Sequence, residues 1–440
     1  MAKGLRRTAF DSAAYEFWSN QYGVVNARDF GTDGAAIQAA ADVLQNGQTL
    51  YIPNGTWVCL KEIILPDNLT SVKVVGGGTQ TILVAATPGM SSVMSASGIT
   101  QSIFSNLYFN VNGNASYGLS LVQSPETSTQ NVLQFIRGQN AVSYLINLIG
   151  QEDTVLIHCA NEGAEGTSTI PGALNWDIPD GAGTIIGGAL FGGCQIAAQA
   201  MQITGATIGP LISNNPNAIS SWIWNLDGCY IYDGVGTGLA PITTSNNLPN
   251  INLNGCYLVS QVSPVWINGN IPSGALIRAT NCMWIQGSTN SHTSATICSA
   301  SGVGVLEIHG GQIVLTGKGT SSSVLLRVGT STTIVRVPLP IAGLTETNPG
   351  AMSLAGPTAG TITWVQHEIG TAKKFIAVAE DYENDTTTAQ SITFPVAFSN
   401  TPAITTNTSG LTISATTSAL TISAPDNTTA YSGVIIIEGI

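Results

Sequence analysis

Residues 224–231 read WNLDGCYI and residues 251–258 read INLNGCYL, so one pattern occurs twice. Their cysteines, Cys229 and Cys256, are 256 − 229 = 27 residues apart. A third copy, IRATNCMW, carries Cys282, and a fourth, LEIHGGQI at 306–313, has glycine at the cysteine position. Weaker copies occur at 104–109 (FSNLYF) and at 192–196 (GGCQI), which holds Cys194. A repeat in the twenties, with insertions, is typical of the coils of a parallel β-helix.

In such a fold each coil stacks on the last at a strand spacing of about 4.8 Å, and side chains alternate between the interior and the surface. We therefore predict that Cys229, Cys256 and Cys282 form one interior column. The outward positions then include Tyr230 and Tyr257, while Arg278 and Glu307 lie on adjacent coils and form an ion pair. Further interior columns pair Leu226 with Leu253 and Ile231 with Leu258.

The seven cysteines are an odd number and include no CxxC pair, which does not favour a disulfide framework. The four histidines are scattered, so no zinc site is predicted. We interpret the thiols as small apolar packing groups, and we expect neither a metal nor a cofactor.

The segment 24–57 predicts a strand, an amphipathic helix and a second strand. Asp33 is a candidate N-cap, and Ile37, Ala40, Ala41 and Leu44 share one helical face. The elements DFG at 29–31, DG at 33–34, AIQAA at 36–40 and PNGTW at 53–57 resemble the entry motif of the pectate-lyase-like superfamily, which includes phage tailspikes. This resemblance implies a right-handed parallel β-helix whose open end is covered by the helix. The segment between the glycine turn and the helix is shorter here than is usual in that family.

The coil pattern ends near Arg336, and a Pro- and Gly-richer stretch follows. From about residue 361 the alternation is that of antiparallel strands, including two LTISA copies that fit one hairpin. The predicted organisation is an N-terminal particle-attachment segment (1–22), a parallel β-helix (23–340), a linker or cap (341–360) and a C-terminal β-sandwich or jelly-roll-like domain (361–440). The run FPVAF at 394–398, followed by Pro402, resembles the C-terminal receptor-binding or trimerisation domains of phage tail fibres.

Charged residues make up 9% of the chain and the formal net charge is −12. Such a chain repels nucleic acid, and no apolar run reaches the ~18 residues of a membrane-spanning helix, so we expect neither partner. The N-terminus has no apolar signal region, which predicts synthesis in a host cytoplasm.

Acidic residues are sparse in the coils, so a cluster is informative. Glu152, Asp153, Asp177 and Asp180 are the candidate catalytic residues, within or near a segment at 159–184 that we predict to be a loop. Glycoside hydrolysis uses two carboxylates, and aromatic faces stack on sugar rings. The candidate sugar-binding residues are Trp176, Trp222, Tyr230 and Tyr257. A lyase is a weaker option, because Arg137, His158 and Arg278 form no cluster in the sequence, and His158 is interpreted as structural.

The resemblance implies a phage tailspike that forms a homotrimer in the virion tail. Attachment to a baseplate or to another tail protein through the short basic N-terminal segment is a separate hypothesis. Two function classes remain open for its host partner, a capsule or O-antigen polysaccharide. One is an endo-acting glycosidase, and the other is a non-enzymatic receptor-binding or structural tail protein. The sparse acids favour the binder, whereas the acidic segment with Trp176 favours the enzyme.

Overall fold

The computed structural model describes residues 23–78, 80–123, 129–162, 172–214, 222–233, 239–261, 265–270, 272, 275–286, 296–301, 305–309, 312–315, 326–327, 334–336, 354–355, 363–369, 372–382, 390–393, 398–406, 410–423 and 431–439. These residues are mostly strand, with a single α-helix, α2 (Gly34–Ala41), and a short 3-10 helix, η1 (Ala27–Asp29). The chain divides into two compact units, Met1–Ile208 and Gly209–Ile440. The described residues make about nine turns of a parallel β-solenoid, so the predicted fold class is confirmed.

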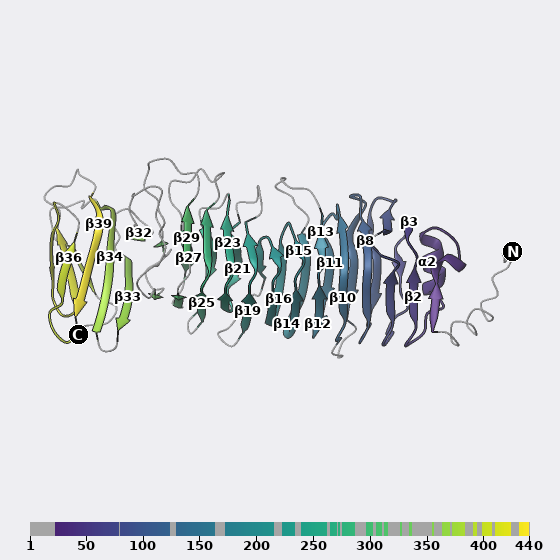
Figure 1. The fold of residues 1–440 in the computed structure, drawn as a ribbon, viewed down its shortest axis with the longest axis horizontal. Helices are drawn as coiled ribbons and strands as arrows, with labels where there is room; N and C mark the ends of the chain where they lie inside the picture. Colours follow the sequence, from purple (N-terminus) through teal and green to yellow (C-terminus); the bar gives the residue numbers. More distant parts are fainter. Residues whose placement is uncertain are drawn as a thin grey trace. The chain divides into compact units, whose positions relative to one another are not determined.

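The first unit contains three columns of parallel strands (Figure 1). Its strands are β1 (Val24–Asn26), β2 (Thr49–Ile52), β3 (Gly55–Cys59), β4 (Ile63–Ile64), β5 (Lys73–Gly76), β6 (Thr81–Ala85), β7 (Met90–Ser97), β8 (Ile103–Asn110), β9 (Ala115–Val122), β10 (Val132–Gln139), β11 (Tyr144–Ile149), β12 (Thr154–Ile157), β13 (Ala160–Asn161), β14 (Gly172–Ile186), β15 (Ala189–Leu190), β16 (Cys194–Thr204) and β17 (Thr207–Ile208). The first column is β1-β2-β5-β8-β10-β12-β14-β16. The second is β3-β6-β8-β10-β13-β15-β17, and the third is β4-β7-β9-β11-β14-β16. The long strands β8, β10, β14 and β16 belong to two columns because each continues around a corner.

The second unit repeats this arrangement in its coils and adds antiparallel strands. Its strands are β18 (Leu211–Ser213), β19 (Ile223–Asp227), β20 (Tyr230–Tyr232), β21 (Ile242–Asn247), β22 (Asn250–Asn254), β23 (Tyr257–Ser260), β24 (Val265–Asn270), β25 (Leu276–Thr280), β26 (Met283–Gln286), β27 (Thr296–Ser301), β28 (Val305–His309), β29 (Gln312–Leu315), β30 (Leu326–Arg327), β31 (Ile334–Arg336), β32 (Leu354–Ala355), β33 (Thr363–Ile369), β34 (Ala372–Tyr382), β35 (Gln390–Thr393), β36 (Ala403–Thr406), β37 (Thr412–Ala415), β38 (Ala419–Ser423) and β39 (Tyr431–Gly439). Its parallel columns are β19-β22-β25-β28-β31, β20-β23-β26-β29 and β18-β21-β24-β27.

The helix α2 caps the first coil, as the sequence predicted. The Asp33 side chain accepts a hydrogen bond from the Ala36 N–H at 3.1 Å, and Ile37 is fully buried. The Gln38 side chain bonds both the N–H and the C=O of Ile64, at 2.7 and 2.9 Å. It thereby occupies backbone groups at the edge of β4, which would otherwise invite pairing with another strand. Figure 1 shows α2 beside β2 and β3.

One corner of every described coil from β8 onward uses a left-handed backbone conformation. In the first unit the corner residues are Asn106, Phe135, His158, Gly187 and Gly205, with φ between 49° and 61°. In the second unit they are Gly228, Gly255 and Asn281, with φ between 52° and 58°. Glycine and asparagine adopt this conformation with the least strain. The residue after each of these corners is buried, except for Gly188, which has no side chain.

The predicted cysteine column is confirmed. The registers Tyr230↔Tyr257↔Met283 place the preceding residues Cys229, Cys256 and Cys282 at successive interior positions, and all three are buried. The Cys256 and Cys282 thiols donate to carbonyl oxygens of the preceding coil at 3.3 and 3.5 Å. The predicted columns Leu226/Leu253 and Ile231/Leu258 are also in register.

One of the two weaker copies was assigned wrongly. The copy at 104–109 is correct, because Asn106 is the corner and Leu107 the buried residue after it. Cys194 does not follow a corner of this kind, since it begins β16 and lies against Leu174. The first-unit cysteine at the interior corner position is Cys159, which follows His158. The error arose because GGC in the sequence resembles DGC and NGC although it belongs to another corner.

The C-terminal strands form two antiparallel sheets, as predicted in outline. One contains β33, β34, β39 and β36, and the other contains β35, β38 and β37. The two LTISA copies form the predicted hairpin, with Thr412 opposite Ser423. Strand β33 pairs in parallel with β31 and antiparallel with β34, so it joins the coil ladder to the antiparallel sheet.

We expect Cys159→Ala to remove part of the pH dependence of stability. Burial raises the pKa of the Cys159 thiol from 9.0 to about 12, so its contribution is complete below pH 9 and is lost as the pH rises toward 12. Between pH 8 and pH 10 the free energy of unfolding should fall by about 1.4 kcal/mol more in the wild type than in Cys159→Ala. Urea unfolding of both proteins at both pH values checks this. An equal fall in the two proteins would contradict it.

Candidate functional site

Polar side chains line the outer face of the second unit's coils. Asn252 donates from its amide to Asn225 Oδ1 at 2.9 Å, and Asn254 donates to Asp227 Oδ1 at 2.9 Å. In both pairs the two residues are register partners on β19 and β22. Register therefore places equivalent polar groups one above another along this face.

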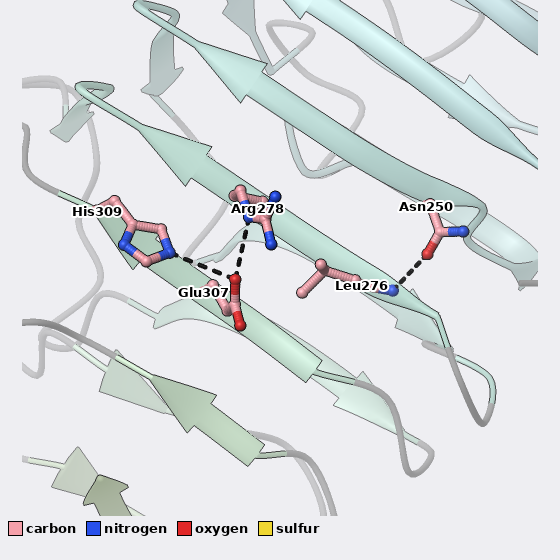
Figure 2. Close-up of polar contacts among 5 residues, drawn as sticks. All are labelled: Asn250, Leu276, Arg278, Glu307 and His309. Carbon is pink, nitrogen blue, oxygen red and sulfur yellow. Dashed lines mark hydrogen bonds and ion pairs between the residues drawn. The ribbon is translucent and has the colours of Figure 1, made fainter. Parts of the chain in front are cut away.

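Farther along the same face lies the Glu307 cluster, made of Arg278, Glu307 and His309 (Figure 2). Arg278 Nε donates to Glu307 Oε2 at 3.0 Å, which confirms the predicted pair, and His309 Nε2 is 3.3 Å from the same oxygen. The Glu307 side chain is only 11% exposed, whereas those of its two partners are about half exposed. Because a poorly solvated carboxylate needs compensating partners, the Arg278 guanidinium stabilises Glu307, and His309 adds to this when its Nε2 carries a proton.

The tyrosines Tyr230 and Tyr257 form a pair of exposed aromatic rings. They are register partners on β20 and β23. Their ring centroids are 6.3 Å apart with an interplanar angle of 26°, and they are 39% and 43% exposed. The structure therefore brings these two predicted binding residues together on the surface.

The two predicted tryptophans lie elsewhere. Trp176 is fully buried, and its indole N–H donates to the Gln151 carbonyl at 3.0 Å. Its ring packs on Gly183, where a Cβ would lie 2.5 Å from the ring. Trp222 is 6% exposed. Neither ring offers a free face to a ligand in the described chain, so the stacking role predicted for them is wrong; both positions point inward.

Of the predicted catalytic residues, Glu152, Asp153 and Asp177 lie on consecutive coils at one corner of the first unit. Glu152 and Asp153 lie in the turn before β12, and Asp177 is exposed on β14, in the next coil. The Glu152 side chain lies against Gly181, where a Cβ would come within 2.6 Å of its Cγ. The side chain of Asp180 lies outside the described residues, so the pairing of these carboxylates stays a prediction. The predicted loop is wrong for residues 172–184, which belong to β14.

The first unit contains a second candidate site, a cavity that the sequence did not predict. Asn106, Leu107, Tyr108, Phe135 and Arg137 line a cavity of about 270 Å³, which we call the Tyr108 pocket. Tyr108 and Arg137 are register partners on β8 and β10.

Beside the pocket, Glu162 interacts with two of its lining residues. The Tyr108 hydroxyl donates to Glu162 Oε2 at 3.3 Å, and Arg137 Nη1 is 4.0 Å from Glu162 Oε1. Burial, followed by the charge of Glu162, raises the pKa of Tyr108 to about 12. Its hydroxyl thus remains protonated at neutral pH.

Two corner residues stack at this pocket. The rings of Phe135 and His158 are 5.6 Å apart and nearly parallel, at 9°. In the next coil, Gly187 lets the backbone approach the His158 ring closely, since a Cβ at this position would lie 2.5 Å from His158 Nδ1. His158 is exposed at a corner, so its interpretation as a structural residue of an apolar strand is corrected. The structure also brings Arg137 and His158 to one area, which the sequence did not indicate.

Comparison of the sequence with protein-family models and with curated proteins finds no match. Within the described part of the chain, no three or more His, Cys, Asp or Glu side chains are placed to hold a metal ion. Among the same residues, no helix combines the length and apolar character that crossing a membrane requires.

Removing Arg278 should destabilise the protein through Glu307. Arg278→Ala leaves a nearly buried carboxylate without its strongest partner, so we expect the free energy of unfolding to fall by about 1–3 kcal/mol. In a Glu307→Gln background, where no carboxylate remains, the same change should cost about 0.5 kcal/mol or less. Denaturant unfolding of the four proteins measures the coupling. Equal losses in the two backgrounds would show that the pair contributes nothing.

Proposed function

We propose that the protein is a tailspike-type receptor-binding protein that recognises a polysaccharide on the surface of a host cell. The observation that carries the proposal is the exposed stack of Tyr230 and Tyr257. Aromatic side chains supply contact area with few rotatable bonds, so they bind the apolar faces of sugar rings at a small entropic cost.

The outward polar residues on β19, β22 and β25 also fit a polyhydroxylated, chain-like ligand. The amides of Asn225 and Asn252 continue in register toward Arg278, and amide groups both donate and accept hydrogen bonds. Coils at about 4.8 Å repeat such groups along the solenoid axis. The net charge of −12 opposes a nucleic-acid partner instead.

The wider assembly belongs to the same proposal. The protein would act as a homotrimer in the virion tail after synthesis in the host cytoplasm, and residues 1–22 would attach it to a tail or baseplate protein. The entry motif at 29–57 supports this, because it resembles that of the pectate-lyase-like superfamily, which includes phage tailspikes. The segment 1–22 lies outside the described residues.

The tyrosine pair gives a direct test of binding. Tyr230→Ala and Tyr257→Ala should each weaken binding of host capsule or O-antigen polysaccharide by roughly 2- to 12-fold, the range expected for one aromatic contact. Biolayer interferometry with immobilised polysaccharide measures the effect. Leu60→Ala, which removes a 67% exposed apolar side chain, is the control and should change nothing. Unaltered affinity in both tyrosine variants would contradict the proposal.

Hydrolysis of the bound glycan is the second candidate function, favoured by the position of Glu152, Asp153 and Asp177 on consecutive coils at one corner. If it occurs there, Asp177→Asn or Asp180→Asn should lower the release of reducing ends by about 100-fold or more. Asp67→Asn, which changes an exposed carboxylate elsewhere in the same unit, should retain full activity. Absence of product from every glycan that binds would leave the protein a binder without catalysis.

A further inference from the structure

We infer that the Tyr108 pocket binds a single sugar residue carrying a negatively charged group, with the anion on Arg137 and the ring against Phe135. The inference deepens the proposed function and rests on it in one respect, namely that the sugar belongs to the recognised polysaccharide. The pocket lies in the first unit and shares no residue with the tyrosine pair.

The backbone is strained at Phe135 and at His158. Both have a positive φ, 53° and 49°, at a corner where Gly187 and Gly205 stand in later coils. A residue with a Cβ pays roughly 1–2 kcal/mol in this conformation, and bulky residues are rare there. Glycine or asparagine at these corners would adopt the left-handed conformation with less strain. Strained residues of this kind gather at ligand sites, which indicates that the two rings have a role beyond the corner.

The Phe135 ring is held in place by residues of the two neighbouring coils. It is 37% exposed and lines the cavity together with Asn106 and Leu107 of the preceding coil. From the following coil, His158 stacks on it at 5.6 Å, and Gly187 lets His158 lie close. A ring fixed before binding loses little freedom when a ligand stacks on it.

Arg137 gives the pocket a positive charge. Arg137 is the one residue lining the Tyr108 pocket that is ionised at neutral pH. Its side chain is 43% exposed, and its Nη1 is 4.0 Å from Glu162 Oε1, beyond hydrogen-bond length. It therefore keeps donors for a planar or tetrahedral anion, which arginine binds in a forked geometry.

The size of the cavity limits the ligand. Its volume of about 270 Å³ is at the lower end of pockets that enclose small molecules, roughly 300–1,000 Å³. One monosaccharide suits this space better than a longer segment. Glu162, on the rim beside Tyr108, accepts hydrogen bonds from sugar hydroxyls but repels the anion, so the charged group must lie on the Arg137 side.

The test uses saturation-transfer NMR and titration on the full chain with three probes: methyl β-D-glucuronide, glucose 6-sulfate and neutral methyl β-D-glucoside. We expect one or both anionic sugars to bind at least 10-fold more tightly than the glucoside. Which of the two binds distinguishes a carboxylate from a sulfate as the recognised group. Equal binding of all three sugars, or no binding of any, would overturn the inference.

Variants tie the binding to the pocket. Arg137→Gln should weaken the anionic sugar at least 10-fold, whereas Lys73→Gln, which removes an exposed positive charge from β5, should not. Glu162→Gln should strengthen binding 2- to 5-fold by removing repulsion. Phe135→Asn should abolish binding while the melting temperature stays the same or rises, because asparagine tolerates the corner. Binding that is indifferent to Arg137→Gln and Phe135→Asn would place the sugar elsewhere and refute the site.

The two proposals fail in different ways. If whole polysaccharide binds the wild type and loses affinity in the tyrosine variants, while no anionic sugar binds the pocket, the inference is wrong and the proposed function stands. If an anionic sugar binds through Arg137 but no host polysaccharide binds, the pocket is correct and the proposed function is wrong.

Discussion

Parallel pairing of each coil with the next is the constraint on which the rest of the structure depends. In a parallel ladder every residue lies about 4.8 Å from its register partner, so an interior side chain is covered by the side chain at the same place in the next coil. Interior positions must therefore be apolar and of compatible size along the whole stack. The series Leu107, Ile136 and Cys159 in the first unit satisfies this requirement. The end of the stack has no next coil, and Gln38 of α2 supplies the missing partners to Ile64.

This constraint is why much of the fold could be predicted from the sequence. Because each interior position packs against the equivalent position of the next coil, similar residues recur at a regular spacing in the sequence. The repeat around Cys229 and Cys256 gave the register that the structure confirms. The prediction failed where local resemblance was used without the register, as for Cys194. It also failed at 172–184, where β14 continues through a corner that the preceding coil makes with a turn between β11 and β12. Turn-forming residues such as Gly181 and Gly183 favoured a loop, but Gly183 pairs with the coils on both sides, and the register with β16 shifts between Ile178 and Ala182.

The surface was harder to predict for the same physical reason. Tyr230 and Tyr257 were found because they follow the repeated cysteines, so their outward direction came with the register. The burial of Trp176 follows equally from alternation, but its register within β14 could not be fixed from a single coil of unusual length. The Tyr108 pocket depends on Phe135 and His158 sharing a corner, and their spacing of 158 − 135 = 23 residues differs from the 27 of the clearest repeat. Only the backbone geometry shows that they are equivalent.

The corners separate what the scaffold requires from what a ligand requires. The scaffold needs a left-handed residue at each corner, but it does not need any particular side chain there, because the group points away from the interior. A corner can therefore accept another residue at a cost of roughly 1–2 kcal/mol without disturbing the ladder. Phe135 and His158 are two such replacements in consecutive coils, and their stacking returns part of the cost, about 0.5–1.5 kcal/mol for an aromatic pair. The two strained rings lie in adjacent coils, next to the guanidinium of Arg137, and together they form one surface. Two replacements that had arisen independently of a ligand would not be expected to share a surface.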